Sequence, residues 1–337
     1  MVHQSFGFVC RAGSRRRYVV VVSSTASLSG EYRAITSACG LLDRSERGKL
    51  ALTGGEAKSF LQGQVTNDVE SLASGTGCYA AFLTPKGKML GDVRILDTGD
   101  ELLLDTERSA LQPLFNMIRR FSLGYDVQLH KRTLERGLVS LIGPAAADVA
   151  GAPQLSEAPE HTHVPIEVGG VAARAIRTDV GVDLLCESAD LGALRSALEA
   201  SGATPVDEPV VECLRVERGR PRYGIELDDT VIPQEAGLND RAVSFTKGCY
   251  VGQETVARLH YRGKPNRQLR GLRVSGPART GDPVWLGERQ VGQLASVAES
   301  PRFGWIALAL VRREAPVGSS VTVADGVGAE VVALPFS

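Results

Sequence analysis

The spacing of hydrophobic residues predicts a chain that mixes helices and strands. Apolar residues recur at intervals of three and four over residues 109–121, as in an amphipathic helix. Helices are also expected over residues 31–40, 55–62 and 191–201. Short apolar runs between turn residues predict strands at 49–53, 78–83, 88–96, 101–105, 135–142, 171–176 and 182–186. Because helices and strands do not alternate strictly, the pattern predicts an α+β fold rather than a doubly wound parallel sheet.

The C-terminal part of the chain has a different pattern. From residue 268 to 336, short strand-like runs are separated by Gly, Pro and Asp. This spacing is typical of a small antiparallel β-barrel, which we expect to occupy residues 265–337. Residues 29–262 are expected to form two α+β lobes, and residues 150–170, rich in Ala, Pro, Glu and His, are predicted to be a surface loop.

Residues 1–28 differ from the rest of the chain. No acidic residue occurs before Glu31, and four arginines lie among Ser and Val. Such a composition is typical of an organelle transit peptide, and it also fits a misassigned start codon on a bacterial gene. We therefore expect a disordered N-terminal extension. The protein is expected to be cytoplasmic in a bacterium, or mitochondrial if the extension is a genuine transit peptide.

Composition and charge exclude several classes of function. The 337 residues are 43% hydrophobic and 23% charged, and the formal net charge is −1. A chain without a global positive field is not expected to bind nucleic acid directly, and no apolar run is long enough to span a membrane. The cysteines form no CxxC pair, so free thiols in a reducing compartment are expected. His161 and His163 alone are weak evidence for a metal, and no metal site is predicted.

The segment with the most chemical information is residues 247–254, which read K-G-C-Y-V-G-Q-E. Cys249 lies two residues after Lys247 and just before a predicted helix, and both features favour the thiolate. Glu254 opposes this effect if it points inward. The alternative is that Cys249 is a small buried hydrophobe, which is common for a free cysteine.

This octet, continued by T-V-A-R, resembles the signature of the YgfZ family of folate-binding proteins, which are related to the aminomethyltransferase of glycine cleavage, the T-protein. The segments F-L-Q-G-Q-V-T-N-D from residue 60, P-K-G-K-M from 85, E-R-G-R-P from 217 and I-P-Q-E from 232 also resemble family motifs. The resemblance covers about residues 30–337. It implies an aminomethyltransferase-like fold of three lobes around a central folate cavity.

The resemblance also implies roles for single residues. Glu217 matches the T-protein glutamate that binds the pterin, and one carboxylate can accept two adjacent N–H bonds. Asp68 matches a carboxylate near the reactive folate nitrogens, where it positions the cofactor or manages a proton. The alternatives are a solvated glutamate in a charged run and a plain turn or helix cap.

Further ligands of tetrahydrofolate, or of a one-carbon derivative, are expected around these acids. Lys247 and Arg258 are candidates for the carboxylated tail, and Tyr250 for stacking on the pterin. Cys249 and Asp68 are the candidate catalytic residues. We therefore expect Asp68, Glu217 and Cys249 to converge on one cavity.

The resemblance implies a tetrahydrofolate-binding accessory protein for the synthesis or repair of iron–sulfur clusters. Its partners would be 4Fe–4S enzymes, including tRNA-modifying ones, or cluster-assembly proteins. A single cysteine cannot hold a cluster alone, so Cys249 is interpreted as a transient ligand or a partner-linking thiol. One alternative is a glycine-cleavage-type aminomethyltransferase, which the octet disfavours because T-proteins lack its cysteine and Q-E. The other is a non-catalytic folate-binding scaffold.

Overall fold

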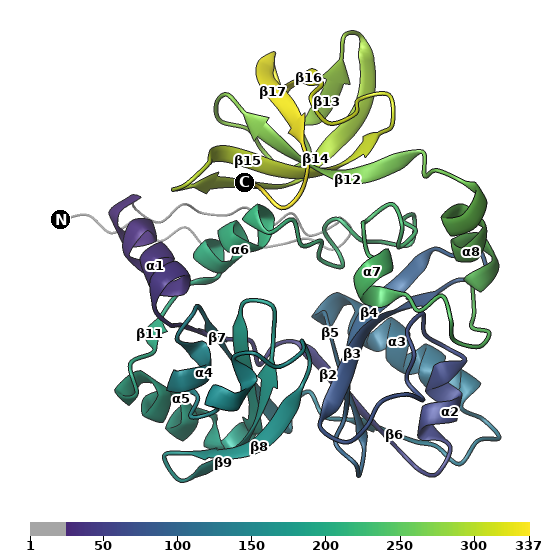
Figure 1. Cartoon of the computed structure of the whole chain (residues 1–337), viewed down its shortest axis with the longest axis vertical. Coiled ribbons are helices and arrows are strands. Elements are labelled where there is room, and N and C mark those ends of the chain that lie inside the picture. The colour runs from purple at the N-terminus through teal and green to yellow at the C-terminus, as the bar shows by residue number, and fades with distance from the viewer. Residues whose placement is uncertain (1–24) are drawn as a thin grey trace, which may run out of the picture.

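The computed structural model describes residues 25–337, and residues 1–24 of the expected N-terminal extension lie outside this range. The described chain begins with helix α1 (Thr25–Ser37). It then forms two sheets and a barrel, which Figure 1 shows as two lobes side by side with the barrel above them. Within the described chain, no helix is long and apolar enough to cross a membrane.

The first lobe is built on a six-stranded sheet in the order β11-β1-β7-β10-β9-β8. Val139, Leu141 and Leu184 of this sheet pack with Leu194 and Leu198 of α5 in one buried core. The strands are β11 (Thr204–Pro205), β1 (Gly40–Asp43), β7 (Arg136–Ile142), β10 (Gly181–Glu187), β9 (Val171–Arg177) and β8 (His163–Val168), and the helices that pack on them are α4 (Ala146–Val149) and α5 (Leu191–Ala200).

The second lobe has a five-stranded sheet in the order β3-β4-β5-β2-β6. Its core joins Phe60 of α2 and Leu114 of α3 to Phe82, Ile95 and Leu104 of the strands. The strands are β3 (Thr76–Leu83), β4 (Met89–Asp97), β5 (Leu102–Thr106), β2 (Gly48–Thr53) and β6 (Gln128–Lys131), and the helices are α2 (Ala57–Gln62) and α3 (Arg108–Phe121).

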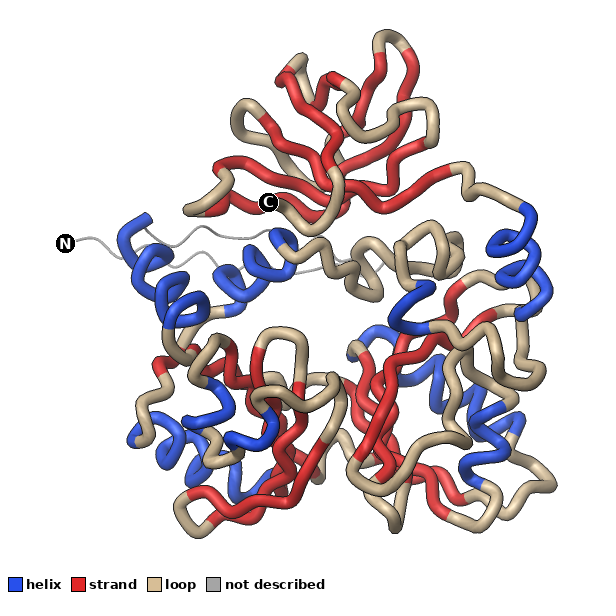
Figure 2. The backbone as a smooth tube through the Cα atoms, in the orientation of Figure 1, coloured by secondary structure: helices blue, strands red, loops and turns tan. Residues whose placement is uncertain are grey.

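The chain places β1 in the first sheet, β2–β6 in the second and β7–β11 back in the first, so the lobes are interleaved in sequence. Helices α6 (Glu208–Glu217) and α7 (Asn239–Ala242) then pass between the lobes and the barrel, and α8 (Gln253–Arg262) leads into the barrel along one flank (Figure 2). The closed barrel runs β12-β15-β14-β13-β16-β17. Its strands are β12 (Arg267–Val274), β15 (Gly304–Arg312), β14 (Arg289–Ser300), β13 (Pro283–Leu286), β16 (Ser320–Val323) and β17 (Val327–Val332).

The predicted α+β class and the C-terminal barrel are confirmed, but one local prediction is wrong and one helix was not predicted. Residues 150–170 are not all loop, because β8 starts at His163. Pro165 disguises this strand, and it is tolerated because β8 lies at the edge of its sheet. Helix α6 had no predicted counterpart, although Pro209 in its first turn is a typical start signal.

Candidate functional site

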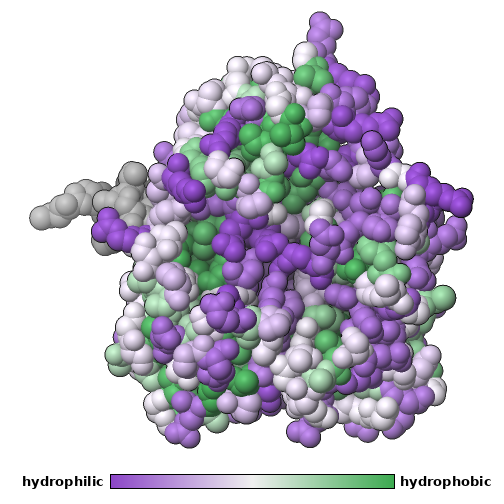
Figure 3. All heavy atoms as spheres, in the orientation of Figure 1, coloured by the Kyte–Doolittle hydropathy of each residue, from purple (hydrophilic) through white to green (hydrophobic). Residues whose placement is uncertain are grey.

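A cavity of about 260 Å³ lies where the two sheets meet. Strands β3, β4 and β5 contribute to one wall, β7 and β10 to the opposite one, and segment 218–222 and Arg241 also line it. Hydrophilic side chains gather in the middle of the face shown in Figure 3, between the lobes and the barrel. The lining includes eight arginines and six carboxylates: Arg44, Arg47, Arg94, Arg215, Arg218, Arg220, Arg222, Arg241, Asp92, Asp105, Glu107, Glu160, Asp179 and Asp183.

Most of these charged side chains form ion pairs with one another. Arg47 contacts Asp105 at 2.8 Å and Glu107 at 2.5 Å. Arg94 contacts Asp105 at 2.8 Å and Asp183 at 2.6 Å, which ties the two sheets together. Burial alone raises the pKa of Asp105, but the two guanidinium groups outweigh it and hold this pKa below its usual value. Asp105 is therefore a charged structural partner rather than a free ligand group.

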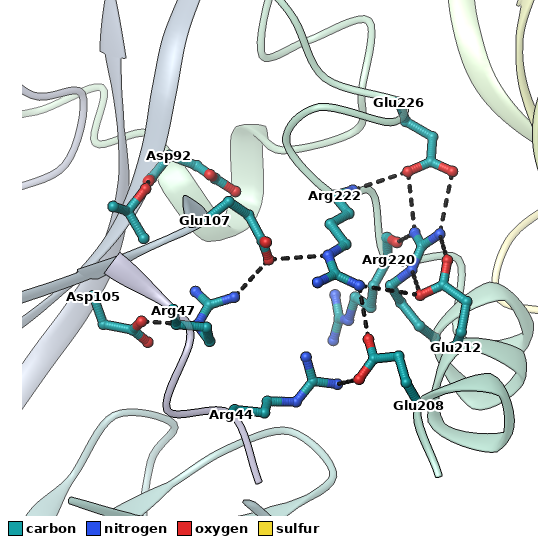
Figure 4. Close-up of polar contacts among 12 residues, drawn as sticks. Arg44, Arg47, Asp92, Asp105, Glu107, Glu208, Glu212, Arg220, Arg222 and Glu226 are labelled. Atoms are coloured by element: carbon teal, nitrogen blue, oxygen red, sulfur yellow. Dashed lines mark hydrogen bonds and ion pairs between the residues drawn. The ribbon is translucent and has the colours of Figure 1, made fainter. Parts of the chain in front are cut away.

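The pairs continue around the rim, as Figure 4 shows for the side facing α6. Arg222 contacts Glu107 at 3.1 Å and Glu208 at 2.8 Å. Arg220 contacts Asp179 at 2.8 Å, and Arg241 contacts Glu160 at 2.5 Å. These contacts order the arginine-rich segment after α6.

Asp92 on β4 differs from the other acids. It is the one carboxylate among the six that has no ion pair to an arginine within residues 25–337. Its Oδ2 accepts a 2.6 Å hydrogen bond from the Tyr79 hydroxyl on β3. Burial raises the pKa of Asp92 to about 6, although Tyr79 and Arg47 act in the opposite direction. A buried carboxylate with spare acceptor capacity is suited to hold a ligand or a proton.

Lys247 and Asp68 lie near each other but outside this cavity. The Lys247 ammonium donates to the carbonyls of Gln62, Val65 and Asn67 at 2.6, 2.7 and 2.9 Å. Burial lowers its pKa to about 8. Asp68 accepts a 3.0 Å hydrogen bond from the Gln62 amide. Slight burial raises the pKa of Asp68, but this bond, Ser71 and Lys247 bring the net pKa below its usual value. Lys247 and Asp68 therefore hold the loop after α2 in place.

The octet forms an ordered turn before α8. Gly252 has a φ of 85° and lies so close to the turn after β3 that an added Cβ would be 2.5 Å from the Thr84 carbonyl oxygen. Cys249 is exposed and Tyr250 is buried, and burial raises the pKa of Tyr250 to about 12. Arg258 is exposed on α8. The thiol of Cys249 therefore faces the surroundings of the protein.

Glu217 lies at the end of α6 and is only 6% exposed. Both carboxylate oxygens accept from the Tyr32 hydroxyl at 2.9 Å, and Oε1 also accepts from Ser300 at 2.5 Å. Burial raises the pKa of Tyr32, and Glu217 raises it further. The carboxylate therefore ties α6 to α1 and to the barrel strand β14. It is neither a solvated side chain nor a residue of the cavity wall.

The cavity between the sheets does not bring Asp68, Glu217 and Cys249 together. None of these residues lines the cavity between the sheets, and neither do Lys247, Tyr250 and Arg258. The physical reason is that Glu217 points toward α1 and β14, whereas the octet packs against the turn after β3 on the flank of the molecule. Their assignment to folate binding or catalysis remains a prediction.

The chain matches two models of one protein family. The GCVT N-terminal domain matches residues 16–247, and the glycine cleavage T-protein C-terminal barrel domain matches residues 267–337. The chain belongs to the glycine cleavage T-protein family.

Relatives in this T-protein family resemble the chain over most of its length. An aminomethyltransferase of Rubrobacter xylanophilus is 31% identical, with 92% of this chain and 86% of the relative covered. The Arabidopsis thaliana protein "Putative transferase At1g60990, chloroplastic" is 28% identical, with 88% of this chain and 71% of the relative covered. The crystal structure of the glycine cleavage system aminomethyltransferase T from Bartonella henselae superposes with a TM-score of 0.82 at 22% identity, with 92% of this chain and 89% of that structure covered. This similarity establishes the shared fold.

The cavity residues that sequence reasoning missed carry a recognisable signal. Asp92 and Arg94 are two residues apart in an otherwise apolar run, so they point to the same face of β4. Charged groups at such positions in a strand of a buried sheet need partners. Asp92 finds Tyr79 on β3 of the same lobe, and Arg94 contacts Asp105 of that lobe and Asp183 of the other. Tyr79 and Arg241 have no comparable signal in the sequence.

A larger depression of about 1060 Å³ lies between β14 and residues 224–235. Glu226 contacts Arg215 at 3.1 Å and Glu235 contacts Arg267 at 3.0 Å. Asp228, like Asp92, has no ion pair in the described chain, but it is only half-buried and accepts from Thr230, whereas Asp92 is buried. The cavity between the sheets, with its unpaired Asp92, is therefore the better candidate site.

Proposed function

We propose that this T-protein family member binds tetrahydrofolate in the cavity between the two sheets, with the pterin facing Asp92. A reduced pterin presents a ring N–H and an amino group side by side, and one carboxylate can accept both hydrogen bonds. The single observation that carries the proposal is that Asp92 lacks an arginine partner in a cavity whose other acids are paired. This assignment replaces Glu217, whose oxygens are occupied by Tyr32 and Ser300.

Size and charge of the cavity support this ligand. About 260 Å³ is just below the range of roughly 300–1,000 Å³ that encloses a drug-sized ligand, so the cavity suits a bicyclic head group with its tail outside. Arginines exceed carboxylates in the lining by eight to six. Arg218 and Arg220 are partly exposed at 42% and 35% of their side chains, and they are suited to meet the carboxylates of the tail.

The second part of the proposal concerns the octet. Following its YgfZ-like signature, we propose that the protein assists synthesis or repair of the clusters of 4Fe–4S enzymes, with Cys249 as the thiol that reaches a partner. Cys249 is exposed and lies apart from the cavity, which suits contact with another protein better than contact with folate. Among the described residues no group of three or more His, Cys, Asp or Glu could hold a metal ion, so a resident cluster is not part of the proposal.

Aminomethyl transfer is the second candidate, and the observation that favours it is the aminomethyltransferase from Rubrobacter xylanophilus at 31% identity. In that case Asp92 would act on a proton at the reacting folate, for which a pKa of about 6 is well placed. Cys249 would then be dispensable.

Calorimetry with tetrahydrofolate under reducing conditions tests the binding proposal on the wild type, Asp92→Asn and Cys249→Ala. We expect binding by the wild type, at least tenfold weaker binding by Asp92→Asn and unchanged binding by Cys249→Ala. A wild type that does not bind would overturn the proposal.

The activity of 4Fe–4S enzymes in cells that carry each variant separates the two candidates. An accessory protein loses function with Cys249→Ala while the variant stays folded. A transferase retains turnover of an aminomethyl donor with Cys249→Ala and loses it with Asp92→Asn. Unaffected cluster enzymes in Cys249→Ala cells would contradict the iron–sulfur assignment.

A further inference from the structure

His161 belongs to the wall of the cavity, although the sequence marked it only as weak evidence for a metal. It lies two residues before β8, and its backbone N–H donates to the carbonyl of Arg177 at 2.8 Å. Its φ is 72°, a left-handed conformation that is uncommon for a residue other than glycine. It lines the cavity together with Tyr79, Asp92 and Arg241. The backbone therefore holds an imidazole in the wall at a conformational cost.

The imidazole of His161 has no hydrogen bond within the described part of the chain. Nδ1 is buried and has no partner. Nε2 lies 3.7 Å from Oε1 of Glu160, which is beyond hydrogen-bond distance. Nδ1 is fully buried and out of reach of a ligand, whereas Nε2, which also lacks a hydrogen bond, is not fully buried and is the nitrogen that a partner from outside can reach.

The charge state of the ring follows from its surroundings. Burial, followed by repulsion from Arg94 and Arg241, lowers the pKa of His161 to about 3. The ring is therefore neutral at physiological pH, with one N–H donor and one acceptor nitrogen. The nearby Glu160 oxygen favours the tautomer with the proton on Nε2. His161 thus offers a neutral donor in a cavity where the other donors are mostly arginines.

We propose that His161 is a ligand-binding residue whose Nε2–H donates to an acceptor atom, a carbonyl oxygen or ring nitrogen, of the heterocycle held by Asp92. This inference rests on the proposed binding of tetrahydrofolate. A series of contacts leads from His161 to that acid. Glu160 contacts Arg241 at 2.5 Å, the Arg241 guanidinium lies 5.5 Å from the Tyr79 ring centre, and Tyr79 donates to Asp92. Asp92 would take the donor edge of the heterocycle and His161 an acceptor on it.

Two matched substitutions test this assignment. Asn accepts a positive φ better than most residues, and its amide reaches only the position of Nδ1, so His161→Asn removes the donor at Nε2. The longer His161→Gln places an amide nitrogen near the position of Nε2. We expect His161→Asn to bind tetrahydrofolate about tenfold more weakly than the wild type, and His161→Gln to stay within about threefold. Asp92→Asn serves as the reference for loss at the same site.

Thermal unfolding separates a loss of binding from a loss of structure. We expect both His161 variants to melt close to the wild type. Should His161→Asn fail to fold, the ¹⁵N chemical shift of His161 Nε2 in the wild type replaces it and is expected to move when tetrahydrofolate saturates the protein. If the wild type binds and Asp92→Asn weakens binding, but His161→Asn binds like the wild type or the shift does not move, the inference is wrong and the proposed function stands. If the wild type does not bind, both are overturned.

Discussion

Replacing Asp92 by Asn tests the description of the cavity without any ligand. Asn keeps the shape of the side chain, and its oxygen can still accept the hydrogen bond from Tyr79. The charge is removed, and the second carboxylate oxygen becomes an NH2 donor. We expect the substitution to stabilise the ligand-free protein at neutral pH, because the native structure disfavours the charged form of Asp92.

The magnitude follows from the pKa of Asp92, which is about 6 in the folded protein against roughly 3.9 in an unfolded chain. A carboxyl whose pKa rises on folding lowers stability as the pH increases through this interval. The difference of roughly two units corresponds to about 3 kcal/mol above pH 7 and to about 1 kcal/mol at pH 4.5. The stabilisation by Asp92→Asn should therefore grow by about 2 kcal/mol between pH 4.5 and 7.5.

Urea denaturation of the wild type and Asp92→Asn at these two pH values measures this difference. Asp105→Asn is the matched control, because Arg47 and Arg94 hold the pKa of Asp105 down. Its substitution should destabilise the protein, and more strongly at pH 7.5 than at pH 4.5. A stabilisation by Asp92→Asn that does not increase with pH would refute the reasoning.

Two further predictions concern structural residues. Gly252→Ala should lower the free energy of unfolding by about 2 kcal/mol in chemical denaturation, because the positive φ of this residue and a carbonyl 2.5 Å from the new Cβ both oppose a side chain. Gly248→Ala is the control and should be close to neutral, because nothing lies within 4 Å of its new Cβ. Glu217→Ala leaves the Tyr32 and Ser300 hydroxyls without their acceptor and should lower the stability measured by thermal unfolding by about 2–3 kcal/mol. Glu217→Gln should lower it less, and equal losses of stability would contradict the hydrogen-bond argument.

The sequence pattern predicted the elements with a strong apolar signal, which comes from one buried face in the helix and from nearly continuous burial in β4. The helix over 109–121 and the strands over 78–83 and 88–96 appear as α3, β3 and β4. The edge strand β8 escaped prediction because Pro165 and its alternating exposure give a weak apolar signal. The local hydrophobic pattern was therefore enough to predict well-buried elements, but not a strand at the edge of a sheet.

The candidate site was less accessible to sequence reasoning. The octet around Cys249 is distinctive, but distinctiveness does not show which way a side chain points. The side chain of Glu217, the last residue of α6, points toward Tyr32 and β14, and this direction is set by tertiary packing. The pairing of Arg94 with Asp183 across the lobes joins residues 89 positions apart, which only the folded chain brings together. Residue type identified candidate groups, and three-dimensional contacts decided which of them share a cavity.

A crystal structure of the full chain with tetrahydrofolate tests the central claim most directly. We expect the pterin between the two sheets, with its ring N–H and amino group on the Asp92 carboxylate and the tail leaving past Arg218 and Arg220. Pterin density in the depression beside β14, or against Cys249 on the flank, would contradict the account.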